Sequence, residues 1–322
     1  MMGTGTFAEP TFNGLFGGRH PVVGLVTQPD RPRGQERGST RQAERGMLDI
    51  ARQHQVPVLQ PDSINTPEGI AGLRAFQPDL LVVAAYGQIL SRDVLAVPPH
   101  GGINVHASLL PKYRGAAPVA WAIYHGETRT GVTIIKMSVR LDAGDMLAQE
   151  AIGIGPEETA GELEARLAPV GARLALRVIE EIASGSEHGA KQDTAAATKA
   201  PKLTKEHGLI DWSRPATDVV NQIRAMQPWP TAYTYYRRRN QEALRVIVHK
   251  ATASAGPLED TALPGQILFS SDRSSRLMVG AGQGSEVEIW ELQPAGKRRM
   301  SSAEFIRGHR LQEGDCFGRQ EP

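Results

Sequence analysis

Short apolar runs alternate with amphipathic stretches through the first half of this 322-residue chain. Consecutive apolar and β-branched residues predict buried strands over 22–26, 56–59 and 79–85. Between them, residues 41–54 and 69–76 space their apolar side chains as helices do. Repeated strand and helix units predict an α/β fold, with a doubly wound, mostly parallel sheet that binds ligands at the carboxyl ends of its strands.

A longer helical pattern follows this region and ends near Gly185. It begins with a capping box at residues 159–162, and apolar side chains recur at helical spacing as far as Ile182. Pro169 falls inside the pattern. Because proline donates no backbone hydrogen bond, we expect a kink or a break near Leu167.

The composition changes after this helix. Residues 188–207 are rich in Ala, Thr, Lys and Gly and lack apolar periodicity, which is typical of a linker. A helix is predicted over 216–226, and short strands separated by Gly- and Pro-rich turns indicate a small barrel. The strand candidates are 244–248, 265–269, 276–279 and 287–292. We therefore expect an N-terminal domain over 1–187, the linker, a barrel domain over 208–316 and a tail over 317–322.

Composition places the chain among two-domain intracellular proteins. A chain of 322 residues with 40% hydrophobic content exceeds the usual size of a single core. The single cysteine, Cys316, excludes an internal disulfide framework and fits a reducing compartment. No apolar stretch approaches the roughly 20 residues that span a bilayer, and no secretory signal is visible. We expect a cytoplasmic monomer that does not associate with membranes.

The net charge of +1 conceals an uneven distribution, with +2 over residues 1–45, −4 over 46–200 and +3 over 201–322. The N-terminal excess lies in a Gly- and Arg-rich segment that contains Arg33, Arg37 and Arg41. Such a segment can follow a phosphate backbone, although a solvated surface loop has the same composition.

A second basic cluster, Arg237, Arg238 and Arg239, follows three tyrosines in the predicted barrel domain. Aromatic and basic side chains together suit nucleic acid, through stacking and phosphate contacts. A strand of buried tyrosines that ends in a charged turn would explain the tyrosines equally well. The tyrosines are Tyr233, Tyr235 and Tyr236.

Asn104 and His106 carry the clearest candidate chemistry. They are two residues apart on a predicted strand, so their side chains project to one face, although an isolated Asn or His is often a turn or core residue. An amide donor beside a histidine that can carry a proton is suited to stabilising an oxyanion. Asp142 follows the β-branched stretch 132–137 and could orient the imidazole and accept a proton. Asp145 competes for this role, but it belongs to a predicted turn. The three residues indicate acyl transfer.

A metal site is not predicted. His20, His100, His125 and His188 lack carboxylate or cysteine partners at the spacing of metal ligands, so we interpret them as surface or packing residues.

The chain resembles the methionyl-tRNA formyltransferase family. Asn104, His106 and Asp142 fall where that family has its catalytic Asn, His and Asp. The segment that contains Asn104 and His106 is shared with other folate-dependent formyltransferases, so it specifies the reaction and not the acceptor. The segments after Lys202 indicate the enzyme whose acceptor is tRNA. Further similar segments are 26–32, 84–90, 113–118, 202–206, 210–212 and 227–233.

The resemblance implies that 10-formyltetrahydrofolate donates a formyl group to the α-amino group of methionyl initiator tRNA, without a metal. It implies a folate site formed by Tyr86, Gly87, Gln88, Ile89, Leu90, Ser108, Leu109, Leu110 and Pro111. It also implies an OB-like barrel that binds tRNA, and a basic N-terminal loop that meets the acceptor arm. The implied tRNA contacts are Arg33, Arg37, Arg41, Lys202, Arg237, Arg238 and Arg239.

The N-terminus departs from the family pattern. A glycine-rich run over 3–8 resembles a nucleotide-binding loop, but only Met1 and Met2 precede it, so the dinucleotide fingerprint is incomplete and NAD binding is disfavoured. In the family a first strand precedes this loop, and the chain lacks it almost completely. We expect either a start further upstream or the loss of a central strand. The first is favoured, because an unfilled central position would expose strand edges.

Two other functions are compatible with parts of the sequence. A formyltransferase acting on a small amine, such as a nucleotide sugar or glycinamide ribonucleotide, would share the catalytic residues but would not need a basic barrel. A non-catalytic tRNA-binding protein on a decayed enzyme fold would explain the missing strand. The intact Asn104, His106 and Asp142 argue against the second.

Overall fold

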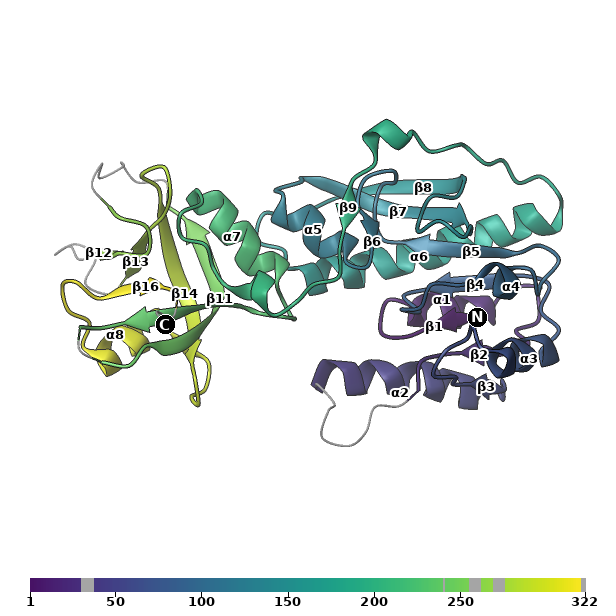
Figure 1. Cartoon of the computed structure of the whole chain (residues 1–322), viewed down its shortest axis with the longest axis horizontal. Helices are drawn as coiled ribbons and strands as arrows, with labels where there is room; N and C mark the ends of the chain where they lie inside the picture. Colours follow the sequence, from purple (N-terminus) through teal and green to yellow (C-terminus); the bar gives the residue numbers. More distant parts are fainter. Residues whose placement is uncertain (30–37, 240, 255–261, 269–275, 320–322) are drawn as a thin grey trace. The chain divides into compact units, whose positions relative to one another are not determined.

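The computed structural model describes residues 1–29, 38–239, 241–254, 262–268 and 276–319, and the side chains of α2 from Gly46 onward. The chain forms two compact units, which are described separately (Figure 1). The first unit comprises Met1–Pro118, Arg129–Gly153 and Glu162–Pro201, and the second comprises Val119–Thr128, Ile154–Gly161 and Lys202–Pro322.

The first unit is built on a seven-stranded sheet with the order β3-β2-β1-β4-β5-β7-β8. Neighbouring strands from β3 to β5 are parallel, whereas β7 is antiparallel to both β5 and β8. This is the doubly wound, mostly parallel sheet that the sequence predicts. The strands are β1 (Met2–Gly3), β2 (Leu25–Val26), β3 (Val58–Leu59), β4 (Leu81–Ala84), β5 (Gly102–His106), β7 (Arg129–Lys136) and β8 (Met146–Gly153).

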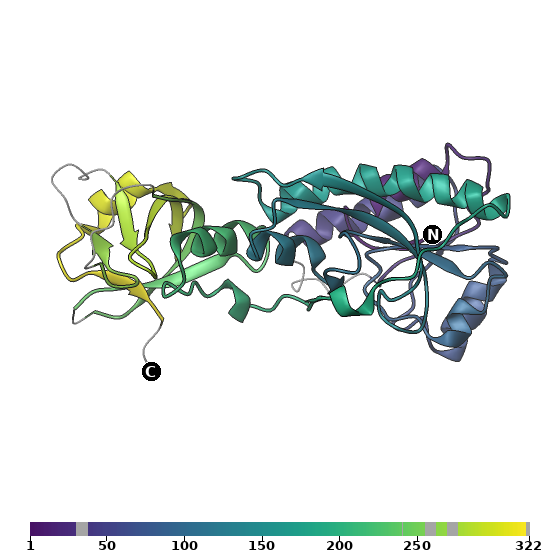
Figure 2. The same ribbon diagram turned by 90° about the horizontal axis from the view of Figure 1, so that it is seen from above.

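Helices cover both faces of this sheet (Figure 2). Gly171 of α6 lies against Val105 and Val132, and α1 packs beside α6 on the same face. On the other face, α3 and α4 enclose a cluster of buried side chains around Leu81 and Val83. No helix in the described part of the chain is both long and apolar enough to cross a bilayer. The helices of the first unit are α1 (Glu9–Leu15), α2 (Gly38–Gln53), α3 (Pro67–Ala75), α4 (Arg92–Leu95) and α6 (Ala160–Ala183), whereas α5 (Pro118–Tyr124) lies almost wholly in the second unit.

A two-residue strand occupies the centre of the sheet. Met2 pairs with Val26 of β2 on one side and with Val83 of β4 on the other, and its side chain is fully buried. The central position is therefore filled, and the loss of a central strand considered from the sequence does not occur. Two residues suffice because Met2 is paired on both sides.

The helix α6 continues through Pro169, so the break expected near Leu167 does not occur. Proline removes only one hydrogen bond of the helix interior. The buried stripe formed by Leu163, Leu167, Leu174 and Val178 continues across it and packs the helix on the sheet.

The second unit contains an antiparallel barrel with the strand order β12-β13-β14-β11-β10-β16. It closes between its first and last strands, where Gln266 bridges Cys316 and the N–H of Phe317 donates to the carbonyl of Gly265 at 2.7 Å. The strand β16 takes the barrel to Gly318, beyond residue 316. The strands are β10 (Ala232–Arg237), β11 (Leu244–Ala253), β12 (Ile267–Leu268), β13 (Leu277–Gly280), β14 (Glu286–Pro294), β15 (Met300–Ser301), which pairs with β14, and β16 (Cys316–Gly318).

Two helices accompany the barrel, and α7 (Ala216–Ala225) was predicted whereas α8 (Ser302–His309) was not. A capping box formed by Ser301 and Glu304 begins α8. Its Phe305 is fully buried, with ring centroids 5.4 Å from Tyr236 and 6.3 Å from Phe317. The helix therefore helps to complete the barrel core.

Part of the segment expected to be a linker has regular structure. It contains η1 (Thr194–Ala196), β9 (Lys199–Ala200) and part of η2 (Glu206–Gly208). The strand β9 pairs in parallel with β6 (Arg114–Gly115). The segment is thus part of the first unit as far as Pro201.

We predict that Gly131→Ala destabilises the first unit by about 1–3 kcal/mol, because a Cβ there would lie 2.0 Å from the carbonyl oxygen of Glu150 on the paired strand. Gly153→Ala, in the same hairpin, is the control, since no heavy atom lies within 4 Å of its Cβ position. Urea denaturation measures both variants. Equal free energies of unfolding for the two would contradict the packing described here.

Candidate active site

The strand β5 places Asn104 and His106 on one face of the sheet, as their spacing predicts. Asn104 lies between Val83 of β4 and Ile135 of β7, and His106 pairs with Thr133. Because β5 is an interior strand, the backbone at both positions is fixed by pairing.

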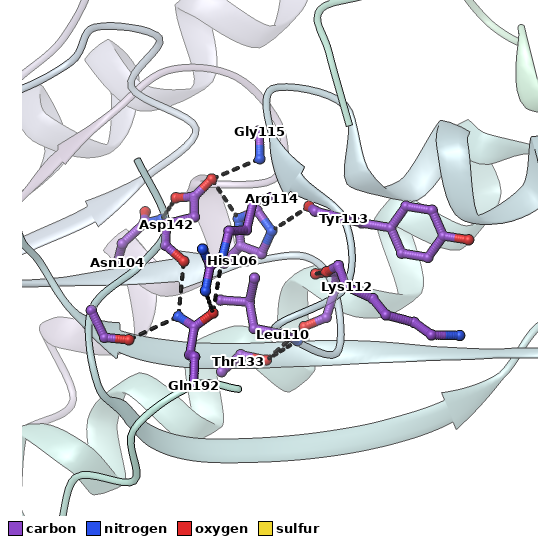
Figure 3. Close-up of polar contacts among 12 residues, drawn as sticks. Asn104, His106, Leu110, Lys112, Tyr113, Arg114, Gly115, Thr133, Asp142 and Gln192 are labelled. Carbon is purple, nitrogen blue, oxygen red and sulfur yellow. Dashed lines mark hydrogen bonds and ion pairs between the residues drawn. The ribbon is translucent and has the colours of Figure 1, made fainter. Parts of the chain in front are cut away.

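Asp142 joins these two residues from the loop between β7 and β8 (Figure 3). Its Oδ2 lies 3.6 Å from Nδ1 of His106, and its Oδ1 accepts a long, 3.5 Å hydrogen bond from Nδ2 of Asn104. The backbone N–H of Gly115 donates to Oδ2 at 2.8 Å. The side chains of His106 and Asp142 are only 5% and 9% exposed. The structure therefore brings the three predicted residues together.

The competing carboxylate, Asp145, is exposed to solvent. Its backbone carbonyl accepts a hydrogen bond from the N–H of Lys136. Asp142 is therefore the carboxylate that reaches the imidazole. Across the described ranges, no three His, Cys, Asp or Glu side chains are grouped so as to hold a metal ion.

The second ring nitrogen of His106 fixes the direction in which the imidazole acts. Its Nε2 lies 2.9 Å from the carbonyl oxygen of Tyr113. A carbonyl only accepts hydrogen bonds, so Nε2 carries the hydrogen and donates it. Nδ1 is left to face Asp142. Tyr113 has a φ of +63°, and its N–H donates to Oγ1 of Thr198 at 2.8 Å.

The segment that follows β5 is fastened to β7. The hydroxyl of Thr133 donates to the carbonyl of Ser108 at 2.6 Å and accepts from the N–H of Leu110 at 3.1 Å. Gln149 of β8 donates both to Oγ1 of Thr133 and to the carbonyl of Leu110. Ser108 and Leu110 are buried, whereas Leu109 and Pro111 are partly exposed. This segment begins directly after His106.

The other predicted folate segment follows β4 and divides into buried and exposed residues. Tyr86 and Leu90 belong to the hydrophobic cluster of the first unit, and burial raises the pKa of Tyr86 to about 12. Gly87 has a φ of +83°, and Ile89 is 68% exposed. Gln88 accepts from the N–H of Ile64 through its side-chain oxygen. Only the middle of the segment can therefore offer side-chain surface to a ligand.

Sequence reasoning missed the residues that hold this site in place. The most connected is Gln192, whose amide contacts Asp142, Gly144 and Arg114. Gln192 lies in a stretch whose composition is typical of a linker, and no local pattern marks it.

The predicted tRNA contacts fall into three groups. Arg33 and Arg37 lie outside the described residues, and Arg41 lies in the part of α2 whose side chains are not described. Lys202 and Arg239 are exposed and Arg237 is partly exposed. Arg238 instead donates to the carbonyls of His309 and Arg310 and forms an ion pair with Asp315, so its guanidinium is largely engaged within the barrel domain.

The three tyrosines before this cluster alternate along β10. Tyr236 is buried and donates its hydroxyl hydrogen to Asp315, and this burial raises its pKa. Tyr233 and Tyr235 are partly exposed, and the guanidinium of Arg245 lies 4.1 Å from the ring centroid of Tyr233. Burial thus explains Tyr236, whereas Tyr233 and Tyr235 keep part of their surface accessible.

Comparison with known proteins agrees with this geometry. Residues 1–179 match the model of the formyl transferase family, and residues 202–310 match the model of the formyl transferase C-terminal domain. The fold and the Asn–His–Asp site thus define a formyl transferase with an attached barrel domain.

Curated relatives narrow this class. The chain is 43% identical over 318 residues to the methionyl-tRNA formyltransferase of Geobacter sulfurreducens, covering 99% of this chain and 96% of that one. It is 39% identical over 318 residues to the enzyme of the same name from Bacillus subtilis, with the same coverage. The chain belongs to the methionyl-tRNA formyltransferase family.

Solved structures support the fold alone. An N-formyltransferase from Helicobacter canadensis, solved with folinic acid and dTDP-3-aminofucose, has a TM-score of 0.62 at 16% identity and covers 89% of this chain and 97% of its own. HypX from Aquifex aeolicus, solved with tetrahydrofolic acid, has a TM-score of 0.54 at 18% identity, over 80% of this chain and 43% of its own.

Proposed function

We propose that this chain transfers the formyl group of 10-formyltetrahydrofolate to the α-amino group of methionyl initiator tRNA, for translation initiation. The observation that carries this proposal is the convergence of Asn104, His106 and Asp142 at the end of β5, in a chain of this family. Both formyl transferase models match the chain, over residues 1–179 and 202–310.

Asp142 serves as the proton acceptor for the attacking amine. An aminoacyl amine must lose its proton before its lone pair can attack the formyl carbon, so a base is needed near neutral pH. The carboxylate of Asp142 is held within 3.6 Å of Nδ1 of His106. Asp142 passes this proton to N10 of the departing folate as the bond between the formyl carbon and N10 breaks, and the attacking nitrogen releases its second proton to solvent.

Asn104 and protonated His106 stabilise the tetrahedral oxyanion. The Nδ2 group of Asn104 makes only a 3.5 Å bond to Asp142, which is weak enough to be exchanged for a developing negative charge. Because Nε2 of His106 is held by Tyr113, the imidazole presents its Nδ1 edge to the reacting group. Donors fixed in this way need little reorganisation when the charge develops.

The folate lies against the two segments that leave the carboxyl ends of β4 and β5. The exposed Gly87 and Ile89 and the partly exposed Gln88, Leu109 and Pro111 provide its contact surface. Tyr86, Leu90, Ser108 and Leu110 shape the site from the buried side, because their side chains are almost fully enclosed.

Basic side chains in both units bind the tRNA. In the first unit the basic loop that contains Arg33, Arg37 and Arg41 meets the acceptor arm, through one or more of these arginines. In the second unit Lys202, Arg237 and Arg239 contact the backbone, with Arg238 supporting them through its ion pair with Asp315. Phosphate contacts of this kind supply affinity and position the substrate without reading its sequence.

The N-terminal domain over 1–187 carries the chemistry, the segment 188–207 connects it to the tRNA-binding domain over 208–316, and the protein acts as a cytoplasmic monomer. A monomer is supported by the site itself, because Asn104, His106 and Asp142 all come from one unit of one chain.

A formyl-transfer assay tests the function directly. Purified protein with 10-formyltetrahydrofolate is expected to formylate methionine-charged initiator tRNA and to leave a charged elongator tRNA largely unmodified. Formylation of a nucleotide-linked amino sugar, with neither tRNA used, would show that the acceptor is a small amine. If folded protein binds folate but formylates none of these acceptors, the proposed reaction is wrong.

We predict that Asn104→Ala and His106→Ala each lower the turnover number by roughly 10²-fold or more, because each removes a donor to the oxyanion. Asp142→Asn keeps the shape of the side chain but removes the base and is expected to lose at least as much. Rapid-quench assays at saturating substrate measure the chemical step. His125→Ala, which alters a histidine of the second unit, is the control, and near-normal turnover in the Asn104 and His106 variants would defeat the mechanism.

We predict that replacing Arg33, Arg37 and Arg41 together by alanine raises the KM for tRNA and flattens its dependence on salt, because fewer counterions are released on binding. The KM for the formyl donor should not change. The matched control replaces three exposed arginines of the first unit, Arg52, Arg173 and Arg177. If both triple variants changed the KM for tRNA and its salt dependence equally, the loop would contribute only through the net charge of the protein.

A further inference from the structure

Gln192 uses every hydrogen-bonding direction of its amide at the edge of the active site (Figure 3). Its Nε2 donates to the carbonyl oxygens of Asp142 and Gly144, at 2.8 Å each. Its Oε1 accepts from Nε and Nη2 of Arg114, at 3.0 and 2.7 Å. One side chain thus ties the turn that carries Asp142 to the segment that follows β5.

Arg114 decides which way this amide points. A guanidinium only donates hydrogen bonds, so its fork can face only the oxygen of Gln192. The NH2 group must then point toward the two carbonyls of the Asp142 turn. The hydrogen-bonding chemistry of the guanidinium therefore sets the orientation of the amide.

Backbone pairing holds the chain in place both before and after Gln192. Two residues earlier, Ala190 exchanges backbone hydrogen bonds of 2.8 and 2.9 Å with Met146 at the start of β8. Downstream, β9 pairs with β6, which contains Arg114 and Gly115. The segment around Gln192 is thus held at both ends within the first unit.

The turn that Gln192 holds has little conformational stability of its own. Asp142 has a φ of +47°, a left-handed conformation that disfavours a residue with a Cβ. At Gly144 a Cβ would lie 1.7 Å from the carbonyl oxygen of Lys136, so only glycine allows this close approach. Without the bonds from Gln192, the carbonyls of residues 142 and 144 would lose the donor that they share.

We propose that Gln192 is a positioning residue for formyl transfer, which acts by holding the backbone of Asp142 so that its carboxylate faces His106. The carboxylate itself has the N–H of Gly115 as its short-range anchor, at 2.8 Å. Gln192 supplies the second anchor, on the carbonyl of the same residue. Together they fix both ends of Asp142. The inference rests on the proposed function, because it assigns a role within that reaction.

Two substitutions separate the bonds that Gln192 makes. Gln192→Glu keeps an oxygen for Arg114 but replaces the donor to the carbonyls of Asp142 and Gly144 by an acceptor. Gln192→Met has a similar length and loses all four bonds. Lys191→Ala, at an exposed neighbouring position, is the matched control.

We predict that both Gln192 variants lower kcat by about ten- to a hundredfold, because small displacements of a catalytic group have large effects on rate. The KM values for the formyl donor and the tRNA should stay within about twofold of the wild type, and the pH profile of kcat should shift, because the contact of Asp142 with His106 changes. The Lys191 variant should match the wild type. Unchanged kcat in a folded Gln192→Glu variant would overturn the proposal.

A double-mutant cycle shows whether Gln192 acts through Asp142. If it does, adding Gln192→Glu to an Asp142→Asn variant costs little further activity, since the group that Gln192 positions is already disabled. Losses that multiply in full would show that Gln192 acts otherwise and would overturn the proposal. Thermal melting of each variant shows whether it is folded. If Gln192→Met does not fold, Gln192→Glu alone tests the proposal. An inactive wild type would count against the function itself.

Discussion

The candidate active site depends on keeping a carboxylate, an imidazole and an amide close together and largely out of water. Buried polar groups are costly unless each is hydrogen-bonded, so the surrounding backbone must supply the missing partners. Here Gly115 bonds to Asp142, Tyr113 bonds to His106, and the sheet fixes Asn104 and His106 from below. The loops around the site are therefore placed where their backbone groups can bond to these buried side chains.

The same demands explain why the segment after β5 is so closely tied to β7. Thr133 lies opposite His106 and bonds twice to the residues that follow it. One hydroxyl thus connects the strand that carries the imidazole with the segment proposed to hold folate. Binding and chemistry are joined through a short, buried stretch of main chain.

Local patterns predicted the sheet, the barrel and the three central residues, because strand alternation and turn composition are local properties. They were less successful where distant contacts decide the structure. Pro169 does not break α6, since the buried stripe continues past it, and Met2 and Gly3 suffice as a strand because neighbours hold them on both sides. Gln192 could not be found, because its role arises only when Ala190 meets Met146 and Arg114 lies nearby.

The pairing of β9 with β6 has a consequence for how this family can exchange parts. A recombination point at the compositional boundary near residue 187 would separate Asp142 from Gln192, Tyr113 from Thr198 and β6 from its partner strand. A point after Pro201 would leave all of these contacts within one inherited piece. The structural module that holds Asp142 is therefore longer than the domain that composition outlines, and a chimaera that keeps these contacts must retain the chain as far as Pro201.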